Sequence, residues 1–222
     1  MVRESVGMSI SHHVNRKETF MSSIQSESAE QSGGGKGIFI ALIPWIVFTV
    51  LVSHATLKLG SVAALAVAIL IAGRSARDGS PKLLEVGAVV TFIGFVVVAF
   101  LADASTAHWI ARYARGIAAL ILSLIAFASL LFTPFTEQYA RDQVPEQYWG
   151  SAKFKAINRK LTTMWACIFA AMVPFHVIAG AIDTRAGNIV FNWAIPLGLV
   201  YWGIKRSSAP EESDTAPVQK IA

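Results

Sequence analysis

The stretch VGAVVTFIGFVVVAFLA at residues 86–102 contains only apolar residues, glycine and one threonine. A helix needs roughly 20 residues of this kind to cross the ~30 Å hydrocarbon layer of a bilayer. Five further apolar stretches accompany it, so that the six predicted spans are about 37–57, 57–73, 83–102, 116–135, 161–182 and 187–204. We therefore expect an all-α integral membrane bundle of six transmembrane helices.

The composition agrees with this class and indicates no reaction. Hydrophobic residues make up 54% of the 222 residues and charged residues only 15%. Chemistry or ion coupling inside a membrane requires polar groups in the spans, and these spans mostly lack them. The chain has no glycine-rich phosphate loop opening a helix and no serine-hydrolase or zinc-protease motif. We expect no enzyme, no catalytic residue, no cofactor and no metal site.

The basic residues indicate the orientation of the chain. Of the 19 lysine and arginine residues, all but Lys58, Arg112, Arg115 and Arg185 fall in the two tails and in the connections after the second and fourth spans. Cytoplasmic connections are enriched in lysine and arginine. Both termini are therefore predicted to be cytoplasmic. Because topology accounts for the net charge of +5, we expect no nucleic-acid partner.

Three regions follow from this pattern. Residues 1–36 and 207–222 are polar and are predicted to be disordered cytoplasmic tails. Residues 37–206 form the transmembrane domain, with a cytoplasmic interfacial loop at 133–160. In the second span Ala64, Ala68 and Ala72 recur at every fourth position, a spacing that brings helices together in membranes or simply reflects an alanine-rich composition.

The 133–160 loop is the longest connection, and loops of this length commonly have a function. Its aromatic residues and its four lysine and arginine residues between 153 and 160 suit the headgroup layer of the lipid bilayer. It is predicted either to orient the fourth and fifth spans or to serve as a docking surface for a partner. The candidate interaction residues are Glu137, Tyr139, Arg141, Trp149, Asn158 and Arg159.

Two alternative functions stay open. The first is a channel or carrier for a small uncharged solute, with a path lined by Pro44, Pro174, Pro196, His176 and Asn192, since broken helices form substrate sites in transporters. The second is a metal- or haem-binding protein that uses the outer-side histidines His54, His108 and His176 with Asp103 and Asp183. Their spacing favours separate structural histidines.

The chain also resembles the intracellular septation protein A family of small bacterial inner-membrane proteins. The resemblance begins at Ile43-Pro44-Trp45-Ile46-Val47-Phe48, continues through the alanine-rich span that ends in Arg74, and returns from Val144-Pro145 to Trp165. It covers roughly residues 38–204. The resemblance implies a multi-pass protein that acts in envelope maintenance or cell division through contacts with other membrane proteins, and it supplies no catalytic residue.

Overall fold

The computed structural model describes residues 37–52 and 56–207, and every regular element in these two ranges is helical. The elements are a first helix at Gly37–Val52, α2 at Leu57–Arg77, α3 at Leu83–Leu101, α4 at Ala104–Ser129, α5 at Phe135–Ala140, a 3-10 turn η1 at Glu146–Tyr148, α6 at Ala152–Ile182, α7 at Arg185–Ile189, a π-helical turn η2 at Val190–Ala194, and α8 at Ile195–Ser207. The predicted all-α class is confirmed for these ranges. The predictions for residues 1–36, for His54 and for residues 208–222 lie outside them.

Four helices are long and apolar enough to cross a membrane, namely α2, α3, α4 and α6. The first helix is apolar but shorter than 18 residues. The last predicted span is divided into α7, η2 and α8. Large apolar side chains are exposed on the outside of these helices, among them Leu70 at 67% and Leu101 at 81%. Such a surface is compatible with contact with lipid.

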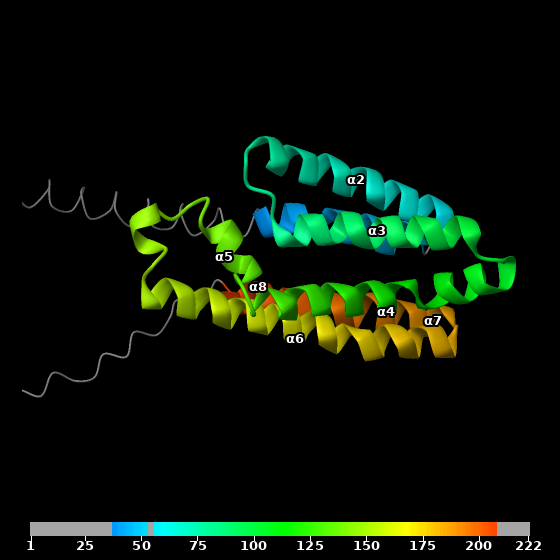
Figure 1. Ribbon diagram of the computed structural model, residues 1–222. Coiled ribbons are helices and arrows are strands. Elements are labelled where there is room, and N and C mark those ends of the chain that lie inside the picture. Colours follow the sequence, from blue (N-terminus) through cyan, green and yellow to red (C-terminus); the bar gives the residue numbers. More distant parts are fainter. Residues whose placement is uncertain (1–36, 53–55, 208–222) are drawn as a thin grey trace, which may run out of the picture.

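The long helices lie side by side, and the chain reverses direction at each connection (Figure 1). The α2–α3 connection and the segment between α4 and α6 lie at one end of the bundle, whereas the α3–α4 and α6–α7 connections lie at the other. The ion pair between Lys82 and Asp142 links the first two connections. The ion pair between Arg112 and Asp183 links two residues at the opposite end. The bundle therefore separates the connections into the two groups that the basic residues indicated.

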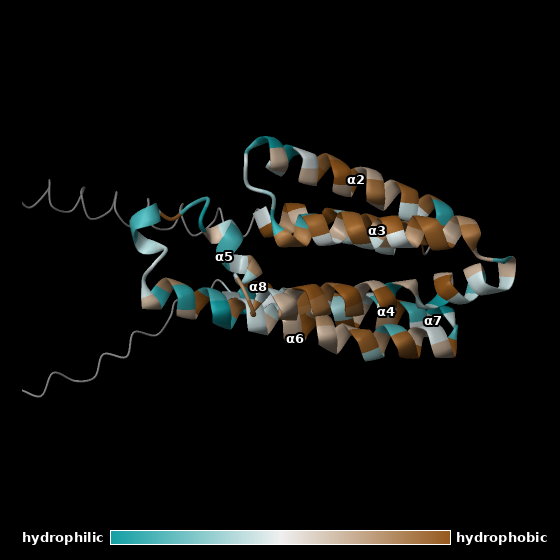
Figure 2. Ribbon diagram, viewed as in Figure 1, coloured by the Kyte–Doolittle hydropathy of each residue, from teal (hydrophilic) through white to brown (hydrophobic). Residues whose placement is uncertain are grey.

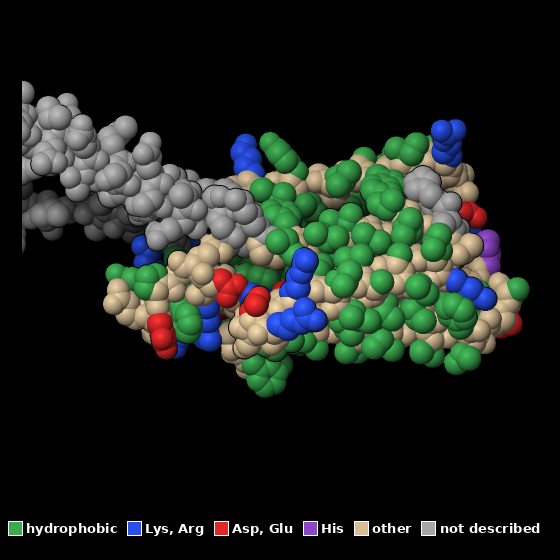
Figure 3. All heavy atoms as spheres, turned by 90° about the horizontal axis from the view of Figure 1, so that it is seen from above, with side chains coloured by type: hydrophobic (Ala, Val, Ile, Leu, Met, Phe, Trp, Pro, Cys, Tyr) green, Lys and Arg blue, Asp and Glu red, His purple; other side chains and the backbone are tan. Residues whose placement is uncertain are grey.

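Polarity follows the same division. The middle of each long helix is hydrophobic, and hydrophilic residues lie in the connections and at the helix ends (Figure 2). A space-filling view from above shows hydrophobic side chains across the body of that face and lysine and arginine toward both ends (Figure 3). An apolar band between two polar ends is the arrangement of a helical bundle in a bilayer.

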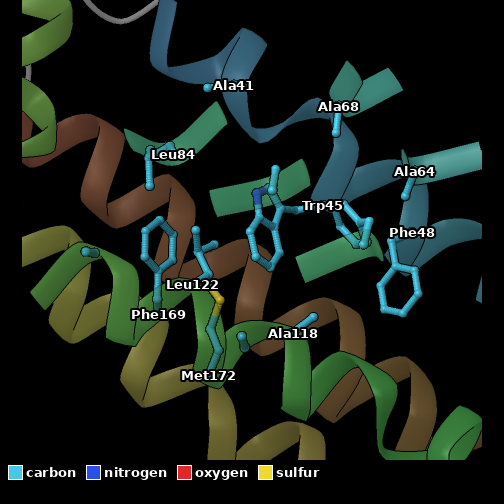
Figure 4. Packing of buried hydrophobic residues seen from close by; sticks show 14 of the residues in the cluster. Ala41, Trp45, Phe48, Ala64, Ala68, Leu84, Ala118, Leu122, Phe169 and Met172 are labelled. Carbon is cyan, nitrogen blue, oxygen red and sulfur yellow. The ribbon is translucent and has the colours of Figure 1, made fainter. Parts of the chain in front are cut away.

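Aromatic rings fill the core between the first helix and α3. The Phe48 ring centroid lies 4.5 Å from that of Phe95, and the Trp45 centroid lies 5.1 Å from that of Phe92. Figure 4 shows Trp45 and Phe48 on the first helix, with Ala64 and Ala68 of α2 nearby. Ala64 and Ala68 are fully buried and Ala72 is half-buried, so the first two positions of this stripe are packed inside the bundle.

Small residues also let α4 and α6 approach closely. A Cβ atom on Gly116 would lie 3.5 Å from the Cβ of His176, and one on Gly180 would lie 2.7 Å from the Cε1 of Tyr113. The Ser123 hydroxyl donates a hydrogen bond of 3.2 Å to the Ala166 carbonyl across the interface. Small side chains and interhelical hydrogen bonds replace the hydrophobic driving force, which is missing between helices in lipid.

Two helices extend beyond the predicted spans because they continue past charged residues. The fourth span was predicted at 116–135, but α4 begins at Ala104 and ends at Ser129. Its start is set by Asp103, whose carboxylate accepts hydrogen bonds from the backbone N–H groups of Ser105 and Thr106. These bonds, led by that from Thr106, hold the pKa of Asp103 below its usual value. Arg112 and Arg115 consequently lie inside the helix.

The fifth span was predicted to begin at 161, but α6 begins at Ala152, after the Ser151 cap whose hydroxyl accepts from the Phe154 N–H at 3.2 Å. The predicted 133–160 loop therefore contains α5, η1 and the first turns of α6.

The break in the last segment has a local cause. Pro196 has no N–H to donate to the carbonyl of Asn192, four residues earlier. The Ile195 N–H bonds instead to the carbonyl of Val190, five residues earlier, which produces the π-helical turn η2.

Candidate functional site

The segment between α4 and α6, residues 130–151, is called the elbow here. Its helix α5 is anchored in the bundle, since Phe135, Thr136, Glu137 and Tyr139 are all buried. Pro134, which cannot continue a helix from the preceding residues, stands at the start of α5. The elbow is therefore a folded element at the end of the bundle, with one short helix packed inside.

Hydroxyl groups attach α5 to α6 and α4. The Thr136 hydroxyl donates a hydrogen bond to the Asn158 carbonyl at 2.8 Å. The Thr162 hydroxyl lies 2.8 Å from the Thr136 hydroxyl oxygen, and because the Thr136 proton is already used, Thr162 is the donor of this second bond. The Phe135 N–H donates to the Ser129 hydroxyl at 3.1 Å. All of these atoms are buried, where an unmade hydrogen bond would cost about 1–3 kcal/mol. This set of bonds fixes the direction in which the chain leaves α4.

A second set of contacts ties the elbow to the start of α3. The Leu83 N–H donates to the Gln138 side-chain oxygen at 2.8 Å. Lys82, which is largely buried, pairs with Asp142 at 2.6 Å and places its ammonium 5.1 Å from the centre of the Tyr139 ring. The elbow therefore bridges the α2–α3 connection and α6.

The outer part of the elbow is held by an ion pair and a tryptophan. Arg141 pairs with the buried carboxylate of Glu137 at 2.6 Å. The guanidinium of Arg141 also lies over the Trp149 ring at 5.2 Å, and the indole N–H of Trp149 donates to the Val144 carbonyl at 2.7 Å. The turn from α5 to η1 is thus closed by side chains of the elbow itself.

Tyr139 is buried without a hydrogen-bond partner. Its hydroxyl makes no hydrogen bond, and neither does the nearby Oε2 atom of Glu85. Burial, together with the negative charges of Glu85 and Asp142, raises the pKa of Tyr139 well above its usual value. The phenol therefore stays neutral and contributes its ring, which also meets Gly37 at the start of the first helix.

The structure divides the six predicted interaction residues into two groups. Glu137, Tyr139 and Asn158 are buried and hold the elbow together, and the Asn158 amide donates to the Phe154 carbonyl at 2.9 Å. Arg141 and Trp149 are half-buried against each other, and Arg159 is exposed. The outward surface of the elbow is instead formed by Glu146, Gln147 and Tyr148, which are all exposed. No pattern in the sequence separates these two groups, because the contacts of α5 join residues distant along the chain.

A second polar cluster, called the polar chain here, lies toward the opposite end of the bundle. Arg115 donates to the side-chain oxygen of Asn188 at 3.0 Å, and the Asn192 amide donates to the same oxygen at 2.7 Å. The Asn192 oxygen is then left to accept from the Nδ1 atom of His176, 2.7 Å away. His176 lies less than two turns before the end of α6, roughly 10 Å along the helix axis.

Arg115 lacks a carboxylate partner among the described residues. It donates from Nε to the Thr49 carbonyl at 3.3 Å and lies 5.7 Å from the Trp193 ring centre, while its Nη2 is buried without a hydrogen bond. The carboxylate of Asp183 pairs with Arg112 at 3.2 Å instead. Within residues 37–52 and 56–207, this partly buried cation is therefore stabilised by a carbonyl, an amide oxygen and an aromatic ring.

The polar chain brings together two residues that the solute-path hypothesis named, His176 and Asn192. Pro196 follows η2, the turn that contains Asn192, whereas Pro174 is exposed on α6 and Pro44 is buried in the first helix. Sequence reasoning missed Arg115 and Asn188, because the charges at 112 and 115 were placed in a connection. The available signal was that Asp103 is a residue type that caps helices, and that Arg112 and Arg115 lie three residues apart, as on one face of a helix.

The residues proposed for metal or haem binding do not gather in the described ranges. His108 is exposed, Asp183 pairs with Arg112, and Nδ1 of His176 is engaged by Asn192. Within 37–52 and 56–207, no three histidine, cysteine, aspartate or glutamate side chains lie where they could hold a metal ion.

Comparison of the chain with protein-family models, with curated proteins and with solved structures gives no match. The resemblance to the intracellular septation protein A family therefore stays a prediction.

Proposed function

We propose that this chain is a six-span protein of a bacterial cytoplasmic membrane, with both termini and the elbow on the cytoplasmic side. Four helices that can cross a bilayer support this proposal, together with the first helix and the α7–α8 segment beside them. The division of basic residues between the two ends supports the orientation.

We further propose that the protein acts without catalysis, by presenting the elbow to a membrane protein of the envelope or division machinery. The supporting observation is that a polar and aromatic surface is exposed on a segment fixed from within. Tyr148 is 52% exposed, whereas Phe135, Thr136, Glu137 and Tyr139 of the same segment are buried, and Thr136 is hydrogen-bonded to α6. A surface held rigid before binding loses less conformational entropy when a partner docks.

Photo-cross-linking from the elbow in living cells tests this function. A photoreactive amino acid at Tyr148 is expected to capture a defined protein, whereas the same group at Leu70, which is 67% exposed on the apolar surface of α2, is not. Identical adducts from both positions, or adducts from neither, would contradict the proposal.

Two variants distinguish a loss of partner binding from a loss of folding stability. Arg141→Ala leaves the buried Glu137 carboxylate unpaired, so we expect a loss of about 2 kcal/mol in stability, less than for a fully buried pair because Arg141 is partly exposed. Tyr148→Ala changes only an exposed side chain and should keep the stability while reducing capture from a probe at Gln147. Undiminished capture in Tyr148→Ala would argue against this surface.

The polar chain favours a second candidate function, passage of a small uncharged or weakly polar solute. Ionisable residues inside a membrane bundle commonly mark a substrate path. If this function holds, proteoliposomes should conduct the solute, and Asn192→Ala should abolish the flux while Asn158→Ala, which changes a buried asparagine at the other end, should not. Equal flux in protein-free liposomes would eliminate this candidate.

A further inference from the structure

The first turns of α6 extend beyond the hydrocarbon layer. The helix has 31 residues, about 46 Å at 1.5 Å per residue, whereas a bilayer core needs roughly 20 residues. Its far end, Ile182, lies beside Arg112 of α4, because the next residue, Asp183, pairs with Arg112. The turns before about residue 163 therefore lie at headgroup depth at the elbow end, where Figure 2 shows α6 as hydrophilic.

This part of α6 is basic and exposed. Lys153, Lys155, Arg159 and Lys160 are all exposed, and residues 152–164 contain no aspartate or glutamate. The neighbouring acidic residues of the elbow are largely engaged, since Glu137 pairs with Arg141 and Asp142 with Lys82. The surface is therefore a source of positive potential at the depth where lipid phosphates lie.

The same face is hollowed. Ala156, Arg159, Lys160, Thr163 and Met164 line an open depression of about 540 Å³. Two cationic groups, a hydroxyl and the apolar side chains of Ala156 and Met164 thus lie together on one face of α6, around this open depression. That combination matches a phospholipid at the boundary between its headgroup and its acyl chains.

We propose that this depression binds the phosphate headgroup of an anionic phospholipid. Arg159 and Lys160 contact the phosphate, Thr163 offers its hydroxyl, and Met164 and Ala156 lie against the start of an acyl chain. A guanidinium suits a phosphate because it offers several N–H donors in a plane. The proposal rests on the membrane crossing of α6 and is independent of any protein partner at Tyr148.

Lipid retention by the purified full-length chain provides the test, measured by native mass spectrometry after release from micelles containing phosphatidylglycerol and phosphatidylcholine. The wild-type chain is expected to retain phosphatidylglycerol selectively. Arg159→Gln with Lys160→Gln should lower this selectivity about fivefold. The matched control, Arg74→Gln with Arg77→Gln, removes two exposed charges at the same end on α2, outside the depression, and should leave the selectivity unchanged.

A third variant distinguishes the depression from diffuse charge. Ala156→Trp fills the depression, keeps both cations and should also lower retention. Excess inorganic phosphate should not displace the lipid if the acyl contacts matter. Equal losses in the α6 and α2 double variants, full retention by Ala156→Trp, or displacement by inorganic phosphate would each overturn the proposal. The elbow cross-links from Tyr148 are a separate readout and should persist in all three variants.

Discussion

At the residue scale, the Tyr139 hydroxyl is the clearest source of strain in the elbow. It is buried without a partner, and its raised pKa means that the fold excludes the phenolate. The contribution of the neutral Tyr139 hydroxyl to the free energy of unfolding is fully present below the usual tyrosine pKa of about 10, and it decreases as the pH rises above that value. Tyr139→Phe removes the unpaired hydroxyl, and with it the loss of stability at alkaline pH.

We expect Tyr139→Phe to match the wild-type stability at pH 7 or to exceed it by about 1 kcal/mol, and to lose less stability between pH 9 and 11. Reversible unfolding in mixed micelles measures both effects. Tyr148→Phe, at an exposed position, should show no difference at either pH. A Tyr139→Phe protein less stable than the wild type at pH 7 would mean that the hydroxyl has a partner.

The bond between His176 and Asn192 is also open to measurement at this scale. In a double-mutant cycle with His176→Ala and Asn192→Ala, we expect a coupling free energy of about 0.5–1.5 kcal/mol, the range of interhelical hydrogen bonds in membranes. The same cycle between His176 and Asn158, at opposite ends of α6, should give none. Coupling of equal size in both cycles would contradict the polar chain.

At the element scale, the contact between α4 and α6 depends on the absence of side chains. A Cβ atom on Gly180 would meet the Tyr113 ring at 2.7 Å and the Arg112 carbonyl at 3.2 Å, whereas one on Gly94 would meet open space. Gly180→Ala should therefore lose about 1–3 kcal/mol because the helices must separate. Gly94→Ala should stay within about 0.5 kcal/mol. Similar losses in both variants, measured by the same unfolding assay, would count against this packing.

The elements themselves could be predicted from the sequence, but not all of their ends. Long apolar stretches predicted the order of the helices, since only a helix satisfies its own backbone in lipid. The start of α4 was missed because flanking charges were taken as its limit, although Asp103 caps the helix well before Arg112. The burial of α5 was not predictable, because its partner Thr162 lies 26 residues from Thr136.

The two candidate sites differ in the same way. The sequence marked the elbow as important through its length and marked His176 and Asn192 through nearby prolines. It could not show that Glu137, Tyr139 and Asn158 are buried, nor that Arg115 and Asn188 complete a chain of hydrogen bonds. Such facts depend on helix packing, which local residue patterns do not determine.

At the scale of the whole molecule, the bundle separates its connections into two ends, and this separation underlies every function considered above. The elbow and the α2–α3 connection share one end through the Lys82–Asp142 pair. The α3–α4 and α6–α7 connections share the other. If the long helices cross a membrane, these two groups must face opposite aqueous compartments.

Cysteine labelling with a membrane-impermeant maleimide tests this claim most directly. In a Cys167→Ala background, which removes the only native thiol, single cysteines replace the exposed residues Ser80, Gln147 and Ala104. In intact cells the reagent should label A104C alone, and S80C and Q147C only after the membrane is permeabilised. Labelling of A104C and Q147C from the same side would contradict the account.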